Sequence, residues 1–370
     1  MFYRQALARM WRPKTFDDVV GQDHILQVLK NSFTLKRIHH AYLFSGMHGI
    51  GKTSIARLMV KSLNCQKGIT ISPCKICDNC LQIEKGNFID FIEVDAASRA
   101  KIEDIRELLE NVQYMPIKGR FKIYLIDEVH MLSRYSFNTL LNVLEEPPEY
   151  VKFFFATTDL QKIPITVLSR CLLFYLRALL IDQILEKLKL ILSHENIIFE
   201  DRALYLLSCE SKGSMRDALS LTDQAVALGN GVITTEIVQN MFGFIDKRYS
   251  LSLIESTIFG DIKNVILQLD QYYNLGLNWE SLLVDMISLL HHISFIQLSC
   301  NTFLEKEYFY TQYLSSRLNK IASYINIKDV QCYYQILLQT RKELPYAPSY
   351  RIGIEMSLFK IFMHSANKKV

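Results

Sequence analysis

The amino-acid sequence predicts an α/β domain with a parallel sheet, followed by a small helical domain and an all-helical domain. Between residues 41 and 178, short apolar runs alternate with longer amphipathic segments, which is typical of strand and helix units around a parallel sheet. After Leu176 the strand-like runs end and several short helical segments follow. From residue 243 onward the pattern stays helical, with longer apolar faces rich in aromatic residues. The expected domains are therefore residues 1–178, 179–242 and 243–370.

Five apolar runs are the expected strands of the first domain, and they read AYLFSG, FIEVDAA, FKIYLIDE, KFFFATT and CLLFYL. The segments between them, such as TSIARLMVKSL and RYSFNTLLNVLEE, place apolar residues at helical spacing. Pro147 and Pro148 close the second of these helices. In the second domain, breaks between short helices are expected near Asn196, Gly213 and Gly229-Asn230.

Composition excludes several classes of protein. The chain has 370 residues, of which 49% are hydrophobic and 22% are charged, so it is neither disordered nor fibrous. Its net charge of +4 is too small to indicate nucleic-acid binding by itself. The first residues contain no apolar run of the signal-peptide kind. The most apolar stretch, LLVDMISLLHHISFIQL, is broken by Asp285 and His291-His292 and is interpreted as a buried helix. We therefore expect a cytoplasmic protein that does not contact a membrane.

A phosphate-binding loop is predicted directly after the first strand. Residues 46–53 match the spacing G-x-x-x-x-G-K-[ST] between a strand and a helix, as the mechanism requires. The glycines let backbone N–H groups turn inward around an anion, and the next helix adds its N-terminal partial charge. Lys52 would reach the outer phosphates, and the Thr53 hydroxyl would bind Mg²⁺. The expected nucleotide contacts are Gly46, Met47, His48, Gly49, Ile50, Gly51, Lys52, Thr53 and Ser54.

An acidic pair at the end of an expected strand suits the same chemistry. The strand FKIYLIDE ends in Asp127 and Glu128. On its own, such an ending is usually a strand that runs into a solvated turn. Beside a phosphate-binding loop, Asp127 can hold Mg²⁺, and Glu128 is the candidate base that orients the attacking water. Together the two motifs predict nucleotide hydrolysis through positioning and charge neutralisation.

Two arginines and two threonines complete the candidate site. Thr157 or Thr158 ends a neighbouring strand at the edge where open α/β sheets bind ligands. Arg170 lies in the run Ser-Arg-Cys just before the last strand, and Arg216 begins a helix of the second domain. The residues alone leave open whether either arginine contacts the γ-phosphate or forms an ordinary surface ion pair.

Four cysteines cluster within NCQKGITISPCKICDNC. Disulfides do not suit a reducing cytosol, and buried free cysteines are the plain alternative. The spacing C-x₈-C-x₂-C-x₂-C fits a tetrahedral metal site better, and four thiolates can hold zinc or iron. Because no redox chemistry is required, Zn²⁺ is predicted, in an insertion over about residues 64–82. A site filled by four thiolates has a structural role. Its expected ligands are Cys65, Cys74, Cys77 and Cys80.

The chain resembles the gamma/tau subunits of bacterial DNA polymerase III clamp loaders, which are AAA+ ATPases, over essentially its whole length. It matches their short form, which lacks the C-terminal tail. The resemblance rests on the order and number of the matching stretches, together with the four-cysteine segment. These stretches are LARMWRPKTFDDVVGQDHI, HHAYLFSGMHGIGKTSIARL, DAASR, YLIDEVHMLS, LLNVLEEPPE, FATTDLQKIPITVLSRC, GSMRDALSLTDQA and RKELPYAP.

This resemblance implies roles for individual residues. Arg170 would reach ATP bound by a neighbouring subunit, and Arg216 would sense the γ-phosphate in its own subunit. Residues 11–22 would form a strap over the adenine, with Arg12, Val19 and Val20 among the nucleotide contacts. Three further residues, at an expected helix N-terminus, are candidates for contact with DNA phosphate, although an ordinary helix cap with solvated charges explains them equally well. They are Ser98, Arg99 and Lys101.

The resemblance also implies partners. The third domain would be the collar that joins subunits into a pentamer. ATP binding would let the assembly open the sliding clamp and grip primer-template DNA during replication, and hydrolysis would release both. The polymerase active site would lie in another subunit of the DNA polymerase III holoenzyme, so that contact with the polymerase core is indirect. The alternatives are a catalytically silent scaffold subunit of the loader and another AAA+ DNA motor, such as a branch-migration ATPase.

Overall fold

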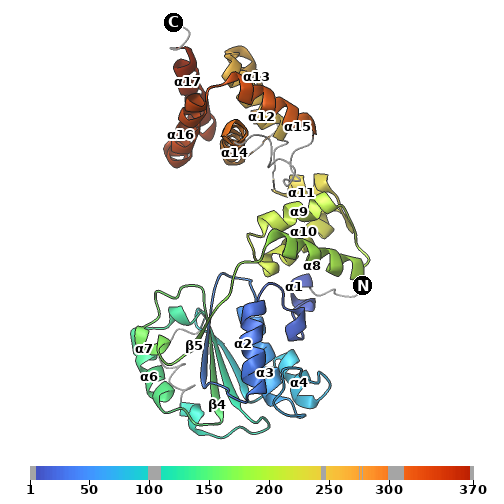
Figure 1. Ribbon diagram of the computed structural model, residues 1–370, viewed down its shortest axis with the longest axis vertical. Helices are drawn as coiled ribbons and strands as arrows, with labels where there is room; N and C mark the ends of the chain where they lie inside the picture. The colour runs from blue at the N-terminus through green and yellow to red at the C-terminus, as the bar shows by residue number, and fades with distance from the viewer. Residues whose placement is uncertain are drawn as a thin grey trace. The chain divides into compact units, whose positions relative to one another are not determined.

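The computed structural model describes residues 6–98, 110–242, 247–274, 276, 278–298 and 312–366. The chain forms two compact units, residues 1–233 and 234–370. The first unit contains a β-sheet with its covering helices and a smaller group of helices (Figure 1). The described residues of the second unit form helices and turns.

A five-stranded parallel sheet forms the centre of the first unit. Neighbouring strands lie in the order β2-β3-β4-β1-β5, and every pair is parallel. All five strands expected from the sequence are confirmed. The carboxyl ends of β1, β3 and β4 meet at one edge, where open α/β sheets bind ligands. The strands are β1 (Ala41–Ser45), β2 (Phe91–Asp95), β3 (Lys122–Asp127), β4 (Val151–Thr157) and β5 (Leu172–Tyr175).

Helices cover both faces of this sheet (Figure 1). Successive side chains of a strand point to opposite faces, and β4 shows the result. Phe154 packs into the core under α2 and α3, whereas Phe153 and Phe155 pack into the core under α6 and α7. All three rings are fully buried, and each stabilises the fold by roughly 1.5–3 kcal/mol. The helices are α2 (Asp23–Thr34), α3 (Lys52–Asn64), α4 (Asp78–Lys85) beside α3, α6 (Arg134–Glu145) and α7 (Ile165–Leu168).

Short elements lie in the connections between these helices and strands. Two of them border predicted site residues, because η1 leads into Val19 and η3 directly follows Glu128. They are α1 (Leu7–Met10) and the 3-10 turns η1 (Phe16–Asp18), η2 (Asn111–Gln113) and η3 (Val129–Met131).

A smaller group of helices follows β5 within the same unit. It consists of α8 (Ile181–His194), α9 (Asp201–Glu210) and α10 (Met215–Leu228), which pack on one another. The breaks expected near Asn196 and Gly213 are confirmed. Both residues adopt positive φ, 55° and 85°, and a left-handed residue is a common way to end a helix.

The prediction that strands end after Leu176 was wrong in one detail. Residues Ile198–Phe199 (β6) pair in parallel with Val232–Ile233 (β7). Strands of two residues are too short to produce an alternating pattern, so the sequence contains no signal for them. They tie the α8–α9 connection to the segment that follows α10.

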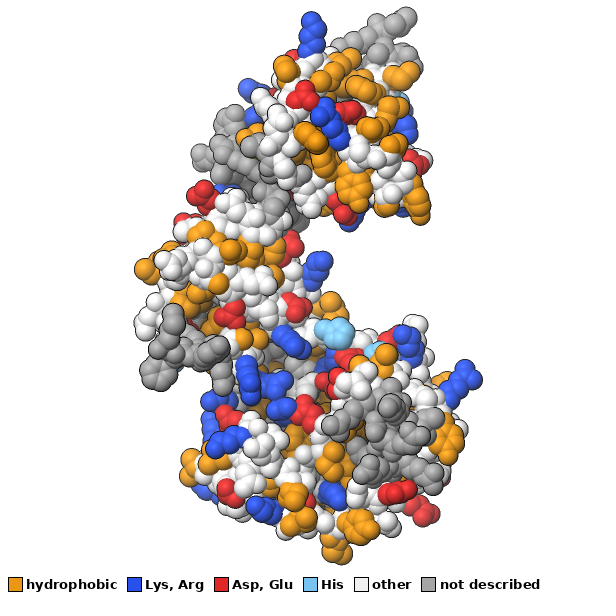
Figure 2. Space-filling view, turned by 180° about the vertical axis from the view of Figure 1, so that it is seen from behind, with side chains coloured by type: hydrophobic (Ala, Val, Ile, Leu, Met, Phe, Trp, Pro, Cys, Tyr) orange, Lys and Arg blue, Asp and Glu red, His pale blue; other side chains and the backbone are white. Residues whose placement is uncertain are grey.

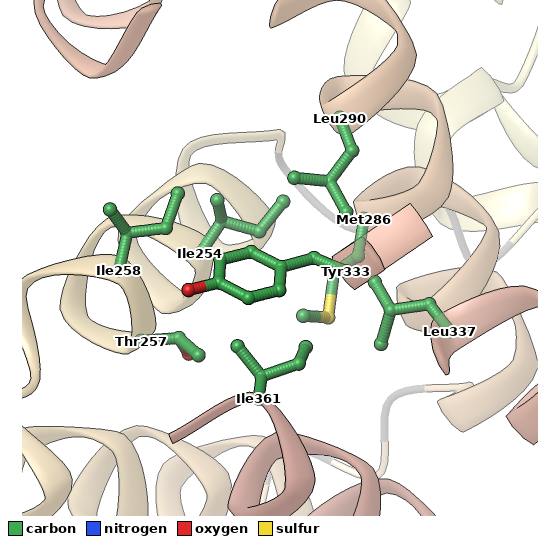
Figure 3. A pocket seen from close by; sticks show the side chains of 8 residues that line it. All are labelled: Ile254, Thr257, Ile258, Met286, Leu290, Tyr333, Leu337 and Ile361. Carbon is green, nitrogen blue, oxygen red and sulfur yellow. The ribbon is translucent and has the colours of Figure 1, made fainter. Parts of the chain in front are cut away.

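The second unit is built from helices. They are α11 (Thr235–Phe242), α12 (Lys247–Phe259), α13 (Ile262–Asn274), α14 (Trp279–Leu298), α15 (Gln312–Tyr324), α16 (Ile327–Glu343) and α17 (Tyr350–Ala366), with the turn η4 (Leu344–Tyr346). Side chains from α12, α14, α16 and α17 share one apolar core. Figure 3 shows such side chains around the ring of Tyr333, which is buried.

Within the described ranges, α14 is the one helix long and apolar enough to cross a membrane, with a mean hydropathy of 1.4 over its most apolar window. It packs against α12, α15, α16 and α17. Six of its side chains lie in the core of the second unit, so one face of this helix is buried. They are Leu282, Leu283, Met286, Leu289, Leu290 and Ile293.

Candidate nucleotide site and cysteine cluster

The predicted phosphate-binding loop connects β1 to α3. Its first residue, Gly46, donates its backbone N–H to the carbonyl of Thr157 at the end of β4, at 3.1 Å. Gly51 is the N-cap of α3 and has φ 106°. A Cβ atom built on Gly51 would meet nothing within 4 Å. The loop therefore leaves open space at the N-terminus of α3, where the partial positive charge of a helix favours an anion.

Lys52 is the first residue of α3, and it is almost fully buried at 5% exposure. Its Nζ donates to the carbonyl of Gly46 at 2.7 Å and to that of Met47 at 2.9 Å. Burial lowers the pKa of Lys52, and the charges of Glu128 and Asp127 oppose this shift. The ammonium group is thus held inside the loop, facing two carboxylates.

Thr53 and the two acidic residues meet at the carboxyl edge of the sheet. The Thr53 hydroxyl donates to Asp127 Oδ2 at 2.8 Å. Asp127 Oδ1 accepts the backbone N–H of Glu128 at 3.0 Å. Glu128 itself has φ 47°, a conformation that is uncommon for a residue with a side chain and that clusters at functional sites. The two motifs that the sequence predicted separately therefore lie in direct contact.

The Glu128 carboxylate has polar neighbours on several sides. The Thr158 hydroxyl donates to Glu128 Oε2 at 3.0 Å. His130 Nδ1 lies 3.3 Å from the same oxygen, and His48 Nδ1 lies 3.4 Å from Oε1. These contacts hold the carboxylate where the loop and two strand ends converge.

His130 also contacts the second predicted threonine. Its Nδ1 lies 3.1 Å from the hydroxyl of Thr157, which is buried and donates to the carbonyl of Asp159 at 3.0 Å. His130 was not predicted from the sequence, although it lies two residues after Glu128 in DEVH. The position of a histidine two residues after a predicted base is the signal that could have identified it.

The helices α8, α9 and α10, here called the lid, contact the loop through the start of α10. The backbone N–H of Arg216 donates to the carbonyl of Gly49 at 3.3 Å. A Cβ on Gly49 would lie 2.0 Å from the Ser214 hydroxyl, so only glycine permits this approach. Ser214 is the N-cap of α10 and accepts the N–H of Asp217. The structure therefore places Arg216 beside the phosphate-binding loop of its own chain.

Arg12 belongs to the same basic region. Desolvation lowers its pKa although the side chain keeps an exposed face, and the charges of Arg57 and Arg216 act in the same direction. Arg57, on α3, forms an ion pair with Glu93 of β2. Figure 2 shows basic side chains gathered where the helical lid joins the sheet domain, with a histidine and acidic side chains nearby.

The structure separates Arg170 from the loop of its own chain. β5 runs parallel to β1 with Tyr42 opposite Leu172, so Arg170 lies at the amino edge of the sheet and Gly46 at the carboxyl edge. Six residues of strand span about 20 Å, which is beyond the reach of an arginine side chain. The Arg170 guanidinium donates to Glu145 Oε1 at 2.7 Å and to the carbonyl of Thr166 at 2.8 Å.

The expected strap, residues 11–22, is attached at both ends. The Trp11 indole N–H donates to Glu195 Oε1 at 3.2 Å, and its ring meets His194 edge to face. Gln22 is fully buried and makes two hydrogen bonds with the backbone of Arg177, at 2.7 and 3.1 Å. Between these ends, Val19 is partly buried against the core on the α2/α3 side, and Val20 is half-buried.

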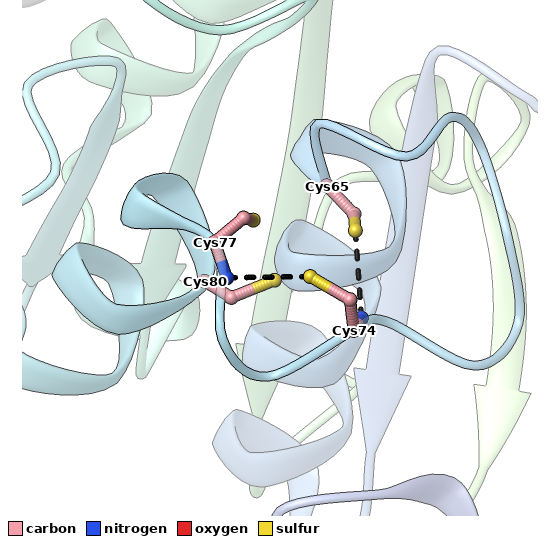
Figure 4. Close-up of side chains that lie close together, drawn as sticks. All are labelled: Cys65, Cys74, Cys77 and Cys80. Atoms are coloured by element: carbon pink, nitrogen blue, oxygen red, sulfur yellow. Dashed lines mark hydrogen bonds between the residues drawn. The ribbon is translucent and has the colours of Figure 1, made fainter.

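The four predicted cysteines converge. Their sulfur atoms all lie within 4.8 Å of one another, as Figure 4 shows. A tetrahedral zinc site has Zn–S bonds near 2.3 Å, which corresponds to sulfur separations of about 3.8 Å. Two backbone N–H groups already point at the cluster: Cys74 donates to Cys65 Sγ at 3.5 Å, and Cys77 donates to Cys74 Sγ at 3.3 Å. The donor set and its spacing therefore fit a tetrahedral metal ion.

Helices hold the cluster against the sheet domain. Cys65 caps the C-terminus of α3, Cys77 is the N-cap of α4, and Cys80 lies in the first turn of α4. The Asn79 amide donates to the carbonyl of Asn64 at 2.9 Å. The module is therefore anchored to the end of α3 as well as closed by its cysteines.

The candidate DNA-contacting residues fall mostly outside the described part of the chain. Ser98 is exposed and donates its hydroxyl to the carbonyl of Asp95 at 3.1 Å. Arg99 and Lys101 lie outside the described residues.

Family models match most of the chain. Three family models match consecutive parts of the chain. They are the DNA polymerase III delta subunit over residues 21–179, the clamp loader subunit ATPase lid domain over 183–231, and domain III of the DNA polymerase III gamma and tau subunits over 233–369. Among solved structures, the branch migration motor RuvB of Thermotoga maritima covers 72% of this chain and 86% of its own, with 19% identity and a TM-score of 0.47.

Sequence relatives extend over nearly the whole chain. DNA polymerase III subunit tau of Escherichia coli (strain K12) is 55% identical over 96% of this chain, which covers 55% of that protein. DNA polymerase III subunit gamma of Buchnera aphidicola subsp. Baizongia pistaciae is 48% identical over 96% of this chain, which covers 96% of that protein. The chain thus spans about half the length of the tau relatives. With its P-loop α/β core of the AAA+ class, its lid and its helical C-terminal unit, the chain belongs to the gamma/tau family of DNA polymerase III subunits.

Proposed function

We propose that this chain is the ATP-binding and ATP-hydrolysing subunit of a DNA polymerase III clamp loader. The observation that carries the proposal is the direct contact between the two halves of a nucleotide site, the Thr53 hydroxyl and the Asp127 carboxylate, beside a buried Lys52. Membership of the gamma/tau family supports the clamp-loading role.

The residues of the site have separate roles in ATP hydrolysis. The loop from Gly46 to Gly51 cradles the phosphates through its backbone N–H groups, and Lys52 neutralises their charge. Thr53 and Asp127 hold Mg²⁺, which when bound neutralises charge on the phosphates. Glu128 orients the attacking water as its base, and Thr158 and His130 hold that carboxylate in position.

The two arginines act on different ATP molecules. Arg216, beside Gly49, senses the γ-phosphate in its own subunit. Arg170 acts on ATP bound by a neighbouring subunit, which its place at the opposite edge of the sheet supports. Hydrolysis then depends on assembly, because each site needs an arginine from another chain.

The cysteine cluster binds Zn²⁺ through Cys65, Cys74, Cys77 and Cys80. When bound, the ion supplies the folding free energy of a segment with little apolar content of its own. Because all four ligands are thiolates, the metal takes no part in ATP hydrolysis.

The partners follow from the proposed role. The second unit is the collar that joins subunits into a pentamer. ATP binding drives opening of the sliding clamp and gripping of primer-template DNA in the cytoplasm, and hydrolysis releases the loaded clamp. Residues 11–22 cover the adenine, with Arg12, Val19 and Val20 in contact with the nucleotide. The polymerase active site belongs to another subunit.

A catalytically silent scaffold is the alternative within the same complex. Such a subunit has no need for a complete phosphate-binding loop together with both carboxylates, and this chain has all of them. The test is ATP turnover by the chain with the other loader subunits, clamp and primed DNA, in wild-type and Lys52→Ala forms. Clamp-dependent turnover that Lys52→Ala abolishes is expected, whereas unchanged loading by Lys52→Ala contradicts the proposal.

A further inference from the structure

One carboxylate on α4, just after the cysteine segment, pairs with two lysines from different parts of the chain. Glu84 lies on α4, and its Oε1 is 3.3 Å from Lys14 Nζ. Its Oε2 is 3.0 Å from Lys61 Nζ. Lys14 belongs to the segment 11–22, which we assign to the adenine, and Lys61 belongs to α3, which begins at the phosphate-binding loop. Glu84 therefore bridges the segment 11–22 and the last turn of α3.

Lys61 depends on this bridge. Its side chain is only 6% exposed, and an ammonium group so far from water requires a compensating partner. Desolvation acts to raise the pKa of Glu84, but the hydrogen bond and charge of Lys61, followed by those of Lys14, lower it below its ordinary value. Glu84 is thus ionised at neutral pH and pairs with both lysines.

Lys14 is joined rigidly to the residues that follow it. The backbone N–H groups of Lys14 and Thr15 donate to Asp18 Oδ2 at 3.1 and 2.9 Å, and the Thr15 hydroxyl donates to the same oxygen at 2.7 Å. Phe16, between them, is 2% exposed and packs near Phe33. A displacement of Lys14 therefore displaces the turn that leads into Val19.

The position of Glu84 depends in turn on the cysteines. α4 has eight residues, too few for a helix that is stable alone. Cys77 and Cys80 fix its first turn, and Ile83 buries one apolar side chain in the core on the α2/α3 side. Glu84 lies one turn after Cys80, so ordering of the cluster also orders the carboxylate.

We propose that Glu84 is a positioning residue that couples the cysteine module to nucleotide binding. With the cysteines ligated, Glu84 holds Lys14 and Lys61 at a fixed separation and so keeps residues 11–22 in place for the adenine. Loss of the metal frees α4, releases Lys14 and weakens nucleotide binding without changing the phosphate-binding loop. This inference rests on the proposed ATP site.

The experiment measures the Kd for ATP of the full chain by calorimetry. Glu84→Gln and Lys14→Gln are each expected to raise the Kd by about two- to fivefold, the size of an ion-pair effect. The double variant should bind like either single variant, because both remove the same link. Lys85→Gln, on an exposed neighbour in the same helix, is the matched control and should leave the Kd unchanged.

Three further readouts separate positioning from general damage. Glu84→Gln should retain its zinc, as measured by metal analysis. In the assembled loader it should raise KM for ATP and leave kcat unchanged. Cys77→Ser should weaken ATP binding when it is introduced into the wild-type chain. Introduced into the Glu84→Gln variant, it should raise the Kd by a smaller factor.

Equal Kd values for wild type and Glu84→Gln overturn the coupling. The coupling is also overturned if Lys85→Gln raises the Kd as much as Glu84→Gln does, or if the effects of Glu84→Gln and Lys14→Gln on the Kd are additive in the double variant. If the wild-type chain binds no ATP at all, the proposed function itself fails. If the chain binds ATP and Glu84→Gln leaves the Kd unchanged, only the coupling fails.

Discussion

Thr53 and Asp127 are 74 positions apart in the chain, yet the Thr53 hydroxyl donates a hydrogen bond of 2.8 Å to Asp127 Oδ2. Thr53 lies in the first turn of α3, and Asp127 ends β3. The contact exists because the parallel sheet brings the carboxyl ends of its strands to a common edge. It joins the phosphate-binding loop to the acidic pair.

Removal of the Asp127 charge should disable Mg²⁺-dependent turnover. In Asp127→Asn, the side chain can still accept from Thr53, so the fold should persist while charge stabilisation at the phosphates is lost. We expect kcat to fall by about 10²-fold or more, since a metal ion contributes several kcal/mol to such transition states. Steady-state ATP turnover by the assembled loader checks this. Near-normal kcat in a variant with an unchanged melting temperature would show that Asp127 does not hold the metal.

Glu128→Gln should separate ATP binding from hydrolysis. The amide can still accept the hydrogen bond from Thr158, but it cannot act as a base. Turnover should drop by about 10²–10⁴-fold, the typical contribution of general base catalysis, with ATP affinity within about twofold of wild type. Glu146→Gln, at an exposed position on the C-cap of α6, serves as the control. Parallel loss of binding and turnover would contradict this assignment.

Substitution of Arg216 and substitution of Arg170 should affect different steps, ATP binding and turnover. Arg216→Ala should weaken ATP binding by the variant chain itself, because Arg216 lies beside Gly49 of its own loop. Arg170→Ala should leave that binding intact and lower turnover of the assembly by about 10³-fold or more. Nucleotide affinity of the isolated chain and turnover of the complex distinguish the two. If Arg170→Ala weakens binding in the isolated chain, its assignment to the neighbouring site is incorrect.

Substitution of one cysteine should mainly affect the metal site and the segment 64–82 around it. Cys77→Ser should release one zinc per chain and loosen residues 64–82, because ligand closure supplies the folding free energy of this segment. ATP should still bind through Lys52 and Thr53, with the modest loss described for Glu84. Metal analysis, proteolysis of the module and ATP titration test this together. Complete loss of ATP binding in a folded variant would show that the cluster shapes the phosphate site.

Asp18 should contribute to acid sensitivity. Desolvation opposes ionisation of Asp18, but hydrogen bonds from Thr15 and Lys14 lower its pKa below the ordinary value. A carboxylate with a lowered folded-state pKa stabilises the fold above its unfolded pKa and loses this effect as pH falls. Asp18→Asn should therefore melt about 2 °C below wild type at pH 7, and the gap should narrow as the pH falls from about 5 through the lowered folded-state pKa of Asp18. A gap that stays constant with pH contradicts this account.

Much of the fold could be predicted from local sequence patterns. Strands β1, β3 and β4 are mainly apolar because they are covered on both faces, and such runs are visible in a single sequence. The β6–β7 pair could not be predicted, since two residues on each side produce no periodic signal. The phosphate-binding loop and the cysteine cluster were predicted because their chemistry requires fixed local spacing.

Contacts between distant segments could not be predicted in the same way. Nothing local to His130 shows that its ring in η3 approaches Thr157 at the end of β4. The approach of Ser214 to Gly49 depends on how the lid packs against the loop. The link from Glu84 to Lys14 joins two solvated charges that a sequence shows as ordinary surface residues. In each case the information lies in the packing of separate elements.

The central claim is that this chain hydrolyses ATP to load a sliding clamp. The most direct measurement is ATP turnover and clamp loading by a loader reconstituted with this chain, its partner subunits, clamp and primed DNA. We predict turnover that clamp and primed DNA stimulate together, and loss of both turnover and loading in Lys52→Ala. Clamp loading by the Lys52→Ala loader at the wild-type rate would contradict the account and identify the chain as a scaffold.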